Sequence, residues 1–123
     1  MPISYKINDE WGCIVETWIG DITAQDLADH WMVYLRDPEV MALRMTLADL
    51  RSARLLFTGA QLASLVETIV VPALGGRSWK TAIVVRDPVQ FGVSRQYQVF
   101  AETYSRDSIF GSEEEALTWL RRS

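Results

Sequence analysis

The sequence predicts an α/β fold, in which a mostly parallel, five-stranded sheet begins with a β-hairpin and carries four packed helices. Three observations lead to this prediction. The chain opens with two alternating segments typical of paired strands, short β-like runs then alternate with helical runs, and capping residues mark the helix starts. Strands that alternate with helices favour right-handed crossovers and therefore parallel pairing.

The hairpin is predicted from residues 3–19. Ile3, Tyr5 and Ile7 alternate with polar residues, which is the period of a strand with one wet face. Residues 8–10 form a turn. The second strand then places one set of residues on the same side: Trp11, Cys13, Val15, Thr17 and Ile19.

Two helices and two strands follow. Thr23 with Asp26, and Thr58 with Gln61, resemble capping boxes that open helices. The first helix has an apolar stripe from Ala24 to Leu35 and ends at Asp37-Pro38, because a residue before proline avoids the α region. Residues 45–50 and 81–85 are apolar runs that predict strands. The second run lacks alternation, so we expect a central strand covered on both faces.

Two further helices complete the prediction. Asp87, Pro88 and Gln90 mark the start of a helix with one apolar stripe. That stripe comprises Val89, Val93, Tyr97, Phe100, Ala101 and Tyr104. After a short strand, Ser112 and Glu115 form a third capping box, and the helix that follows docks on the core through Ala116, Leu117 and Leu120.

The composition limits the possible functions. The 123 residues fit one domain (1–123), and a hydrophobic content of 49% indicates a packed core. A net charge of −4 argues against nonspecific binding to nucleic acid. The sequence shows no transmembrane segment and no signal peptide, and its single cysteine excludes an internal disulfide, so we expect a cytoplasmic protein.

The chain resembles the SpoIIAA-like family, within the wider group of STAS and SEC14-like domains. The resemblance rests on the hairpin and on five short segments: residues 20–23, 47–51, 80–85, 91–95 and 110–120. It implies a compact β-α superhelix around a mostly parallel sheet. In STAS domains of the anti-sigma antagonist type, a serine is phosphorylated where the helix after the third strand begins. The resemblance makes Thr58 the matching hydroxyl, although Phe57 stands where that motif has an acidic residue. The alternative is that Thr58 is only a helix cap.

No catalytic constellation is recognisable. The sequence contains no phosphate-binding loop and no metalloprotease or hydrolase motif. His30, the only histidine, lies at the edge of an apolar helix stripe, and Cys13 lies in mid-strand, where a thiol is protonated and inert. We therefore predict no catalytic residue, no metal site and no cofactor.

Three arginines lie near the carboxyl ends of strands, where α/β sheets bind ligands. Arg51 and Arg54 follow one strand and Arg86 follows the next, so they are candidates for holding an anion. The alternative is that these arginines are solvated charges or form ion pairs with neighbouring aspartates and bind no ligand.

Phe91 and Arg95 fall outside the apolar stripe of the helix that begins at Pro88. An outward phenylalanine one turn from an arginine is typical of an interface, which predicts a homodimer or a protein partner. Alternatively, Phe91 packs beneath the loop at Gly75 and Gly76.

Three functions remain open. The first is a non-enzymatic interaction or regulatory module. The second is a carrier or sensor of a small apolar or anionic ligand, as the SEC14-like side of the group suggests. The third is an enzyme with an unrecognised site near Arg51 and Arg86.

Overall fold

The computed structural model describes residues 2–122. Five strands in this part of the chain form one sheet. Its strands are β1 (Ile3–Asn8), β2 (Cys13–Ile22), β3 (Met45–Leu55), β4 (Trp79–Val84) and β5 (Ser105–Phe110). They lie side by side in chain order, with β1 and β2 antiparallel and the other neighbours parallel. The predicted fold class is confirmed.

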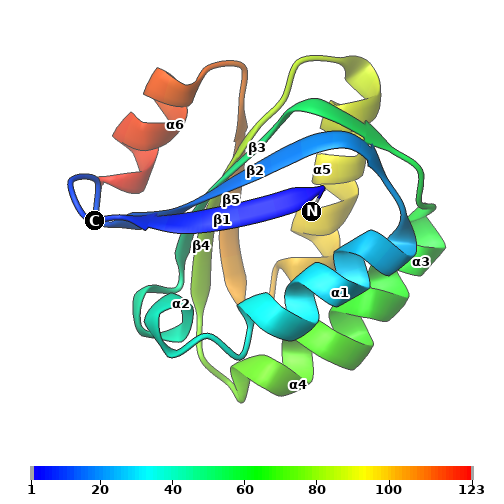
Figure 1. Cartoon of the computed structure of the whole chain (residues 1–123), viewed down its shortest axis with the longest axis horizontal. Coiled ribbons are helices and arrows are strands. Elements are labelled where there is room, and N and C mark those ends of the chain that lie inside the picture. Colours follow the sequence, from blue (N-terminus) through cyan, green and yellow to red (C-terminus); the bar gives the residue numbers. More distant parts are fainter. Residues whose placement is uncertain (1, 123) are drawn as a thin grey trace.

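The helices cover the two faces of the sheet unequally (Figure 1). One face carries α1 (Ala24–Tyr34), the continuous helical rod Gly59–Leu74 and α5 (Pro88–Ala101). The rod consists of α3 (Gly59–Leu65), the π-helical segment η1 (Val66–Val70) and α4 (Val71–Leu74). The other face carries α6 (Glu113–Leu120), which contacts β3, β4 and β5.

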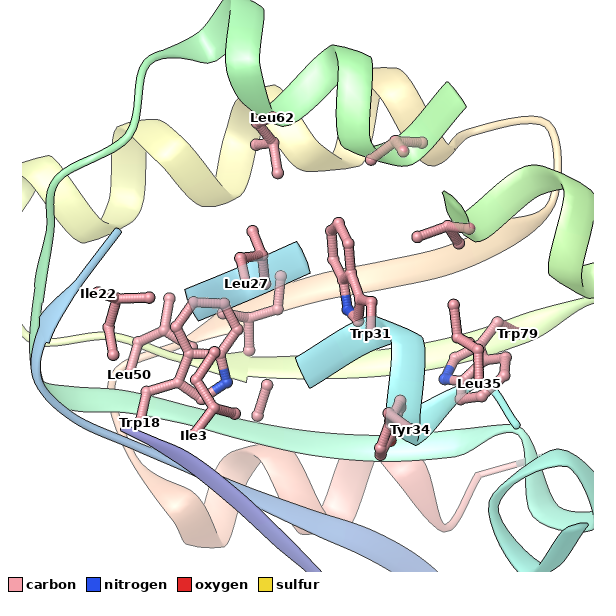
Figure 2. Close-up of a cluster of buried hydrophobic side chains, with 14 of the residues drawn as sticks. Ile3, Trp18, Ile22, Leu27, Trp31, Tyr34, Leu35, Leu50, Leu62 and Trp79 are labelled. Carbon is pink, nitrogen blue, oxygen red and sulfur yellow. The ribbon is translucent and has the colours of Figure 1, made fainter. Parts of the chain in front are cut away.

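The sheet separates two hydrophobic cores. The larger core lies between the sheet and α1, α3 and α5, and Figure 2 shows Leu27, Trp31 and Leu62 of the helices above Trp18 and Leu50 of the strands. The smaller core lies beneath α6. It comprises Cys13, Leu47, Ala82, Val84, Ala116 and Leu120. Both faces of β4 are therefore buried, as its sequence predicted.

The prediction of four helices missed α2 (Pro38–Leu43). Asp37 and Pro38 do end α1, but they also start the next helix. The Asp37 carboxylate accepts a hydrogen bond from the Glu39 amide, and Pro38 occupies the first turn, where its missing N–H is not needed. The Asp37-Pro38 pair therefore both ends α1 and begins α2.

Several local predictions need correction. β3 extends to Leu55, five residues beyond the predicted end. Ser112 caps α6 through the Glu115 amide, but the Glu115 carboxylate bonds to the Ser112 hydroxyl and not to its amide, so the box is only half formed. The register of β2 against β3 shifts between Thr17 and Ile19, and Ile19, at the end of the predicted side, is 58% exposed whereas Cys13 is buried.

The α5 stripe is also shifted from the predicted one. Val89 is 63% exposed, whereas Gln90 is 1% exposed and fully enclosed. Gln90 is buried because its amide nitrogen donates to the carbonyls of Leu50 and Ala53, at 2.7 and 2.8 Å. A polar residue thus joins the first turn of α5 to β3.

The π-helical segment η1 keeps one face of the rod on the core. Leu62, Val66, Val70 and Leu74 recur at every fourth residue, and all four are buried. An α-helix has 3.6 residues per turn, so such a series would drift around its surface. The wider π turn offsets this drift and keeps Val70 against the sheet side of the molecule.

Candidate functional site

An internal cavity of about 80 Å³ lies between the sheet and the helices of the larger core. Side chains of β2, β3 and β4 line it from the sheet, and side chains of α1, α3, η1 and α5 line it from above. Its walls are buried: Leu27, Trp31 and Val70 are less than 9% exposed. Figure 2 shows Leu27 and Trp31 in this layer.

A buried carboxylate forms part of the sheet wall of the cavity. Glu16 of β2 is 4% exposed, and both of its oxygens accept hydrogen bonds. The Trp18 indole nitrogen donates to Oε1 at 2.7 Å, and His30 Nε2 of α1 lies 2.9 Å from Oε2. His30 is also 4% exposed. A buried polar or charged group is costly unless it is hydrogen-bonded, so Glu16 and His30 depend on each other.

Hydroxyl groups supply further polar atoms around the cavity. The Tyr34 hydroxyl lies 2.6 Å from Thr46 Oγ1, which also accepts from the Trp79 indole at 3.0 Å. On the α5 side, the Tyr97 and Tyr104 hydroxyls are 3.3 Å apart. Burial raises the pKa of Tyr97 well above its usual value, so this hydroxyl stays protonated at neutral pH.

A second, partly buried carboxylate, Asp107 of β5, lies one strand away from the cavity lining. It lies beside Thr81, which lines the cavity, in the parallel register of β4 and β5. Ser105 donates a 2.6 Å hydrogen bond to Asp107 Oδ1, while Oδ2 is buried without a hydrogen-bond partner among the described residues. Burial raises the pKa of Asp107 to about 6.

Sequence analysis did not single out Glu16 or Asp107. The available signal for Glu16 was its position between Ile14 and Trp18, two apolar residues that share its face of the strand. An acidic residue flanked in this way is buried when helices cover that face of the sheet and exposed when they do not. Asp107 carried no comparable signal.

The two reactive residues considered from sequence lie on opposite sides of the sheet. His30 belongs to the cavity side, while Cys13 belongs to the core beneath α6. Burial raises the pKa of the Cys13 thiol, which keeps it protonated. Within residues 2–122, no three His, Cys, Asp or Glu side chains converge on a point that would suit a metal ion.

The arginines proposed to hold an anion lie in three separate ion pairs. Arg51 donates to both oxygens of Asp49, at 3.0 and 2.9 Å, and this guanidinium lowers the pKa of the Asp49 carboxyl. Arg54 lies 3.4 Å from Asp21, and Arg86 lies 3.9 Å from the neighbouring Asp87. Each arginine thus has a carboxylate partner already, and a shared anion site remains a prediction.

Thr58 caps α3 as the sequence predicted. Its hydroxyl accepts from the Gln61 amide at 3.1 Å, and the Gln61 side chain accepts from the Thr58 amide at 2.9 Å. Thr58 is exposed, while Phe57 beside it is buried. The cap accounts for the threonine, and its phosphorylation remains a prediction.

Phe91 and Arg95 both face outward from α5. Phe91 is 49% exposed, and Arg95 is exposed with its guanidinium 3.2 Å from the Gln98 side chain. The alternative, in which Phe91 is covered by the loop at Gly75, does not fit this exposure.

No helix within residues 2–122 has the length and apolar character needed to cross a bilayer.

No protein-family model and no curated protein matches the chain. Solved structures do resemble it. One is an uncharacterised DUF3478-family protein with a SpoIIAA-like fold from Shewanella loihica PV-4, at 16% identity and a TM-score of 0.62, covering 96% of this chain and 91% of that one. Another is an anti-sigma factor antagonist from Mycobacterium paratuberculosis, at 17% identity and a TM-score of 0.58, covering 98% of this chain and 95% of that one. At such identities the likeness is one of fold, so the predicted SpoIIAA-like fold is confirmed.

Proposed function

We propose that this chain is a non-enzymatic regulatory module that binds a small, largely apolar molecule in its internal cavity. The cavity of about 80 Å³ between the sheet and the helices carries this proposal. Protein interiors are closely packed, and voids much larger than one water molecule are few. A cavity of this size at the centre of the larger core therefore suits a ligand.

The absence of enzymatic activity is part of the proposal. A nucleophile needs a base within hydrogen-bond reach. Cys13 and His30, the residues from which such a pair would be built, have the sheet between them. The anti-sigma factor antagonist that shares this fold fits a regulatory role. A single unpaired thiol also fits a reducing compartment such as the cytoplasm.

Xenon tests whether the cavity accepts a guest, because it binds in dry apolar cavities without needing polar contacts. We expect xenon pressure to produce saturable shifts in the amide NMR signals of Ala48 and Thr81, which line the cavity. Ala48→Leu fills the cavity and abolishes these shifts. Ala60→Leu adds the same side chain at an exposed position of α3 and leaves them unchanged. Unsaturable or absent shifts in the wild type contradict the proposal.

A homodimer or protein partner bound through Phe91 and Arg95 is the second candidate function. Its support is the 49% exposure of Phe91 on the outer face of α5. Light scattering of the wild type, Phe91→Ser and Val99→Ser tests the dimer. Val99 is 60% exposed two turns further along the same helix and serves as the control. We expect a dimer for the wild type and Val99→Ser and a monomer for Phe91→Ser. A monomeric wild type or an unaffected variant contradicts this candidate.

A further inference from the structure

The cavity wall carries a strong hydrogen-bond acceptor with capacity to spare. Each oxygen of the Glu16 carboxylate accepts one hydrogen bond within the described residues, from Trp18 on one side and His30 on the other. A carboxylate has about four acceptor sites, two on each oxygen. Glu16 therefore retains acceptor capacity, and it lines the cavity.

A second feature concerns charge. Within the part of the chain that the structure describes, no lysine or arginine lines the cavity. Among the described residues, the side-chain partners of Glu16 are the Trp18 indole and the His30 imidazole. An anionic ligand would bring a second negative charge into an apolar interior without a counter-charge, which is strongly unfavourable. A cationic ligand would have to compete with His30 for the same carboxylate.

The size of the cavity limits the ligand further. An engineered cavity of about 150 Å³ holds benzene, which has six carbon atoms, so about 80 Å³ corresponds to roughly three or four non-hydrogen atoms. Several hydroxyl groups of the wall already have partners: the Tyr34 hydroxyl bonds to Thr46, and the Tyr97 hydroxyl bonds to Tyr104. Most of the remaining wall is aromatic and aliphatic, including Trp31, Trp79 and Ile83. The ligand is therefore short, and all but one of its groups are apolar.

From these three features we infer that the cavity selects a small neutral alcohol, whose hydroxyl donates to the Glu16 carboxylate while its carbon atoms pack against the aromatic wall. The inference rests on the proposed function and names the ligand class for the same cavity. Of the apolar and anionic ligands considered from sequence, it retains a largely apolar one and excludes the anion.

Four probes of similar size test the inference: 1-propanol, propanoate, propylammonium and xenon, each titrated at neutral pH and followed by the amide NMR signals of Ala48 and Thr81. We expect 1-propanol to bind at least tenfold more tightly than propanoate or propylammonium. Equal or tighter binding of either ion overturns the inference.

Variants separate the carboxylate from the cavity around it. In Glu16→Leu with His30→Leu the polar pair is replaced by hydrocarbon, so 1-propanol should bind at least tenfold more weakly while xenon binds within about twofold of the wild type. Cys13→Ala alters the same strand on its opposite face and serves as the control, with both affinities unchanged. If the double variant binds both 1-propanol and xenon as tightly as the wild type, Glu16 has no role in binding the alcohol.

A conservative variant keeps the test valid if the double variant does not fold. Glu16→Gln retains the shape and one oxygen acceptor but removes the charge, so the preference for 1-propanol over propanoate should fall at least tenfold. An unchanged preference overturns the inference. The two proposals fail in different ways. If xenon binds and 1-propanol does not, only the alcohol is wrong, whereas if no probe binds, the proposed cavity function fails as well.

Discussion

Lys80 holds the C-terminal end of α6 through Trp119. Its ammonium group donates to the Trp119 carbonyl at 3.1 Å and lies 4.6 Å from the centroid of the Trp119 ring. The same nitrogen donates to the carbonyls of Leu120 and Arg122, at 3.1 and 2.7 Å. The last carbonyls of a helix have no partner within it, and a cation there also interacts favourably with the helix dipole. Lys80 therefore fastens α6 to the central strand β4.

Lys80→Met tests this role. Methionine keeps the apolar stem but removes all three hydrogen bonds, so we expect a loss of roughly 2–4 kcal/mol in the free energy of unfolding. Lys6→Met, at an exposed position of β1, is the control and should change stability by less than about 0.5 kcal/mol. Urea unfolding of both variants measures the difference, and equal midpoints would show that the contact does not stabilise the protein.

Gln90→Leu should destabilise the junction between α5 and β3. The substitution leaves the carbonyls of Leu50 and Ala53 without their donor, and unsatisfied buried acceptors cost about 1–3 kcal/mol each. We expect a total loss of roughly 2–6 kcal/mol in thermal or urea unfolding. Gln25→Leu, at an exposed position of α1, controls for the change of residue type. A wild-type midpoint for Gln90→Leu would contradict the prediction.

The Glu16–His30 pair predicts strongly non-additive effects. Removing either partner alone leaves the other buried polar group without its hydrogen bond, which costs about 1–3 kcal/mol and more where that group is charged. Glu16→Leu and His30→Leu should each cause such a loss. The double variant should be more stable than the single Glu16→Leu variant. A double-mutant cycle by urea unfolding measures the coupling, and additive losses would mean that the residues act independently.

The raised pKa of Asp107 predicts that the free energy of unfolding falls as the pH rises. Its folded-state pKa of about 6 lies above the usual value of about 3.9, so between these values the folded chain binds a proton that the unfolded chain has released. The free energy of unfolding therefore falls as the pH rises through this window. Asp107→Asn removes this contribution. The stability of the variant relative to the wild type should increase from about pH 4 to about pH 7. A constant difference in urea unfolding across that range would contradict the raised pKa.

Local signals in the sequence predicted much of the fold. Thr23, Thr58 and Asp87 each cap a helix through a side-chain oxygen that accepts from an amide three residues later. Such motifs act over a few residues, so they can be identified without knowing the rest of the structure. Pro38 shows the limit, because the same residue suits the end of one helix and the start of another.

The candidate site could not be predicted in the same way. The burial of Glu16 depends on helices covering its face of the sheet, and its partner His30 lies on a different element, α1. The cavity is the space left when side chains of seven elements pack together, a property of no single segment. The sequence placed His30 at the edge of its stripe and gave it no catalytic role, but its pairing with Glu16 appears only in three dimensions.

Because Cys13 is buried beneath α6, the reactivity of its thiol reports local opening of that face of the sheet. The only cysteine of the chain is 0% exposed and lies in the core beneath α6. A thiol-specific dye can modify it only in molecules where that face has opened, so the labelling rate, divided by the rate for a free thiol, gives an opening equilibrium constant. Because the cavity lies on the other face of the sheet, a cavity ligand that slows this labelling would show that the two faces open cooperatively.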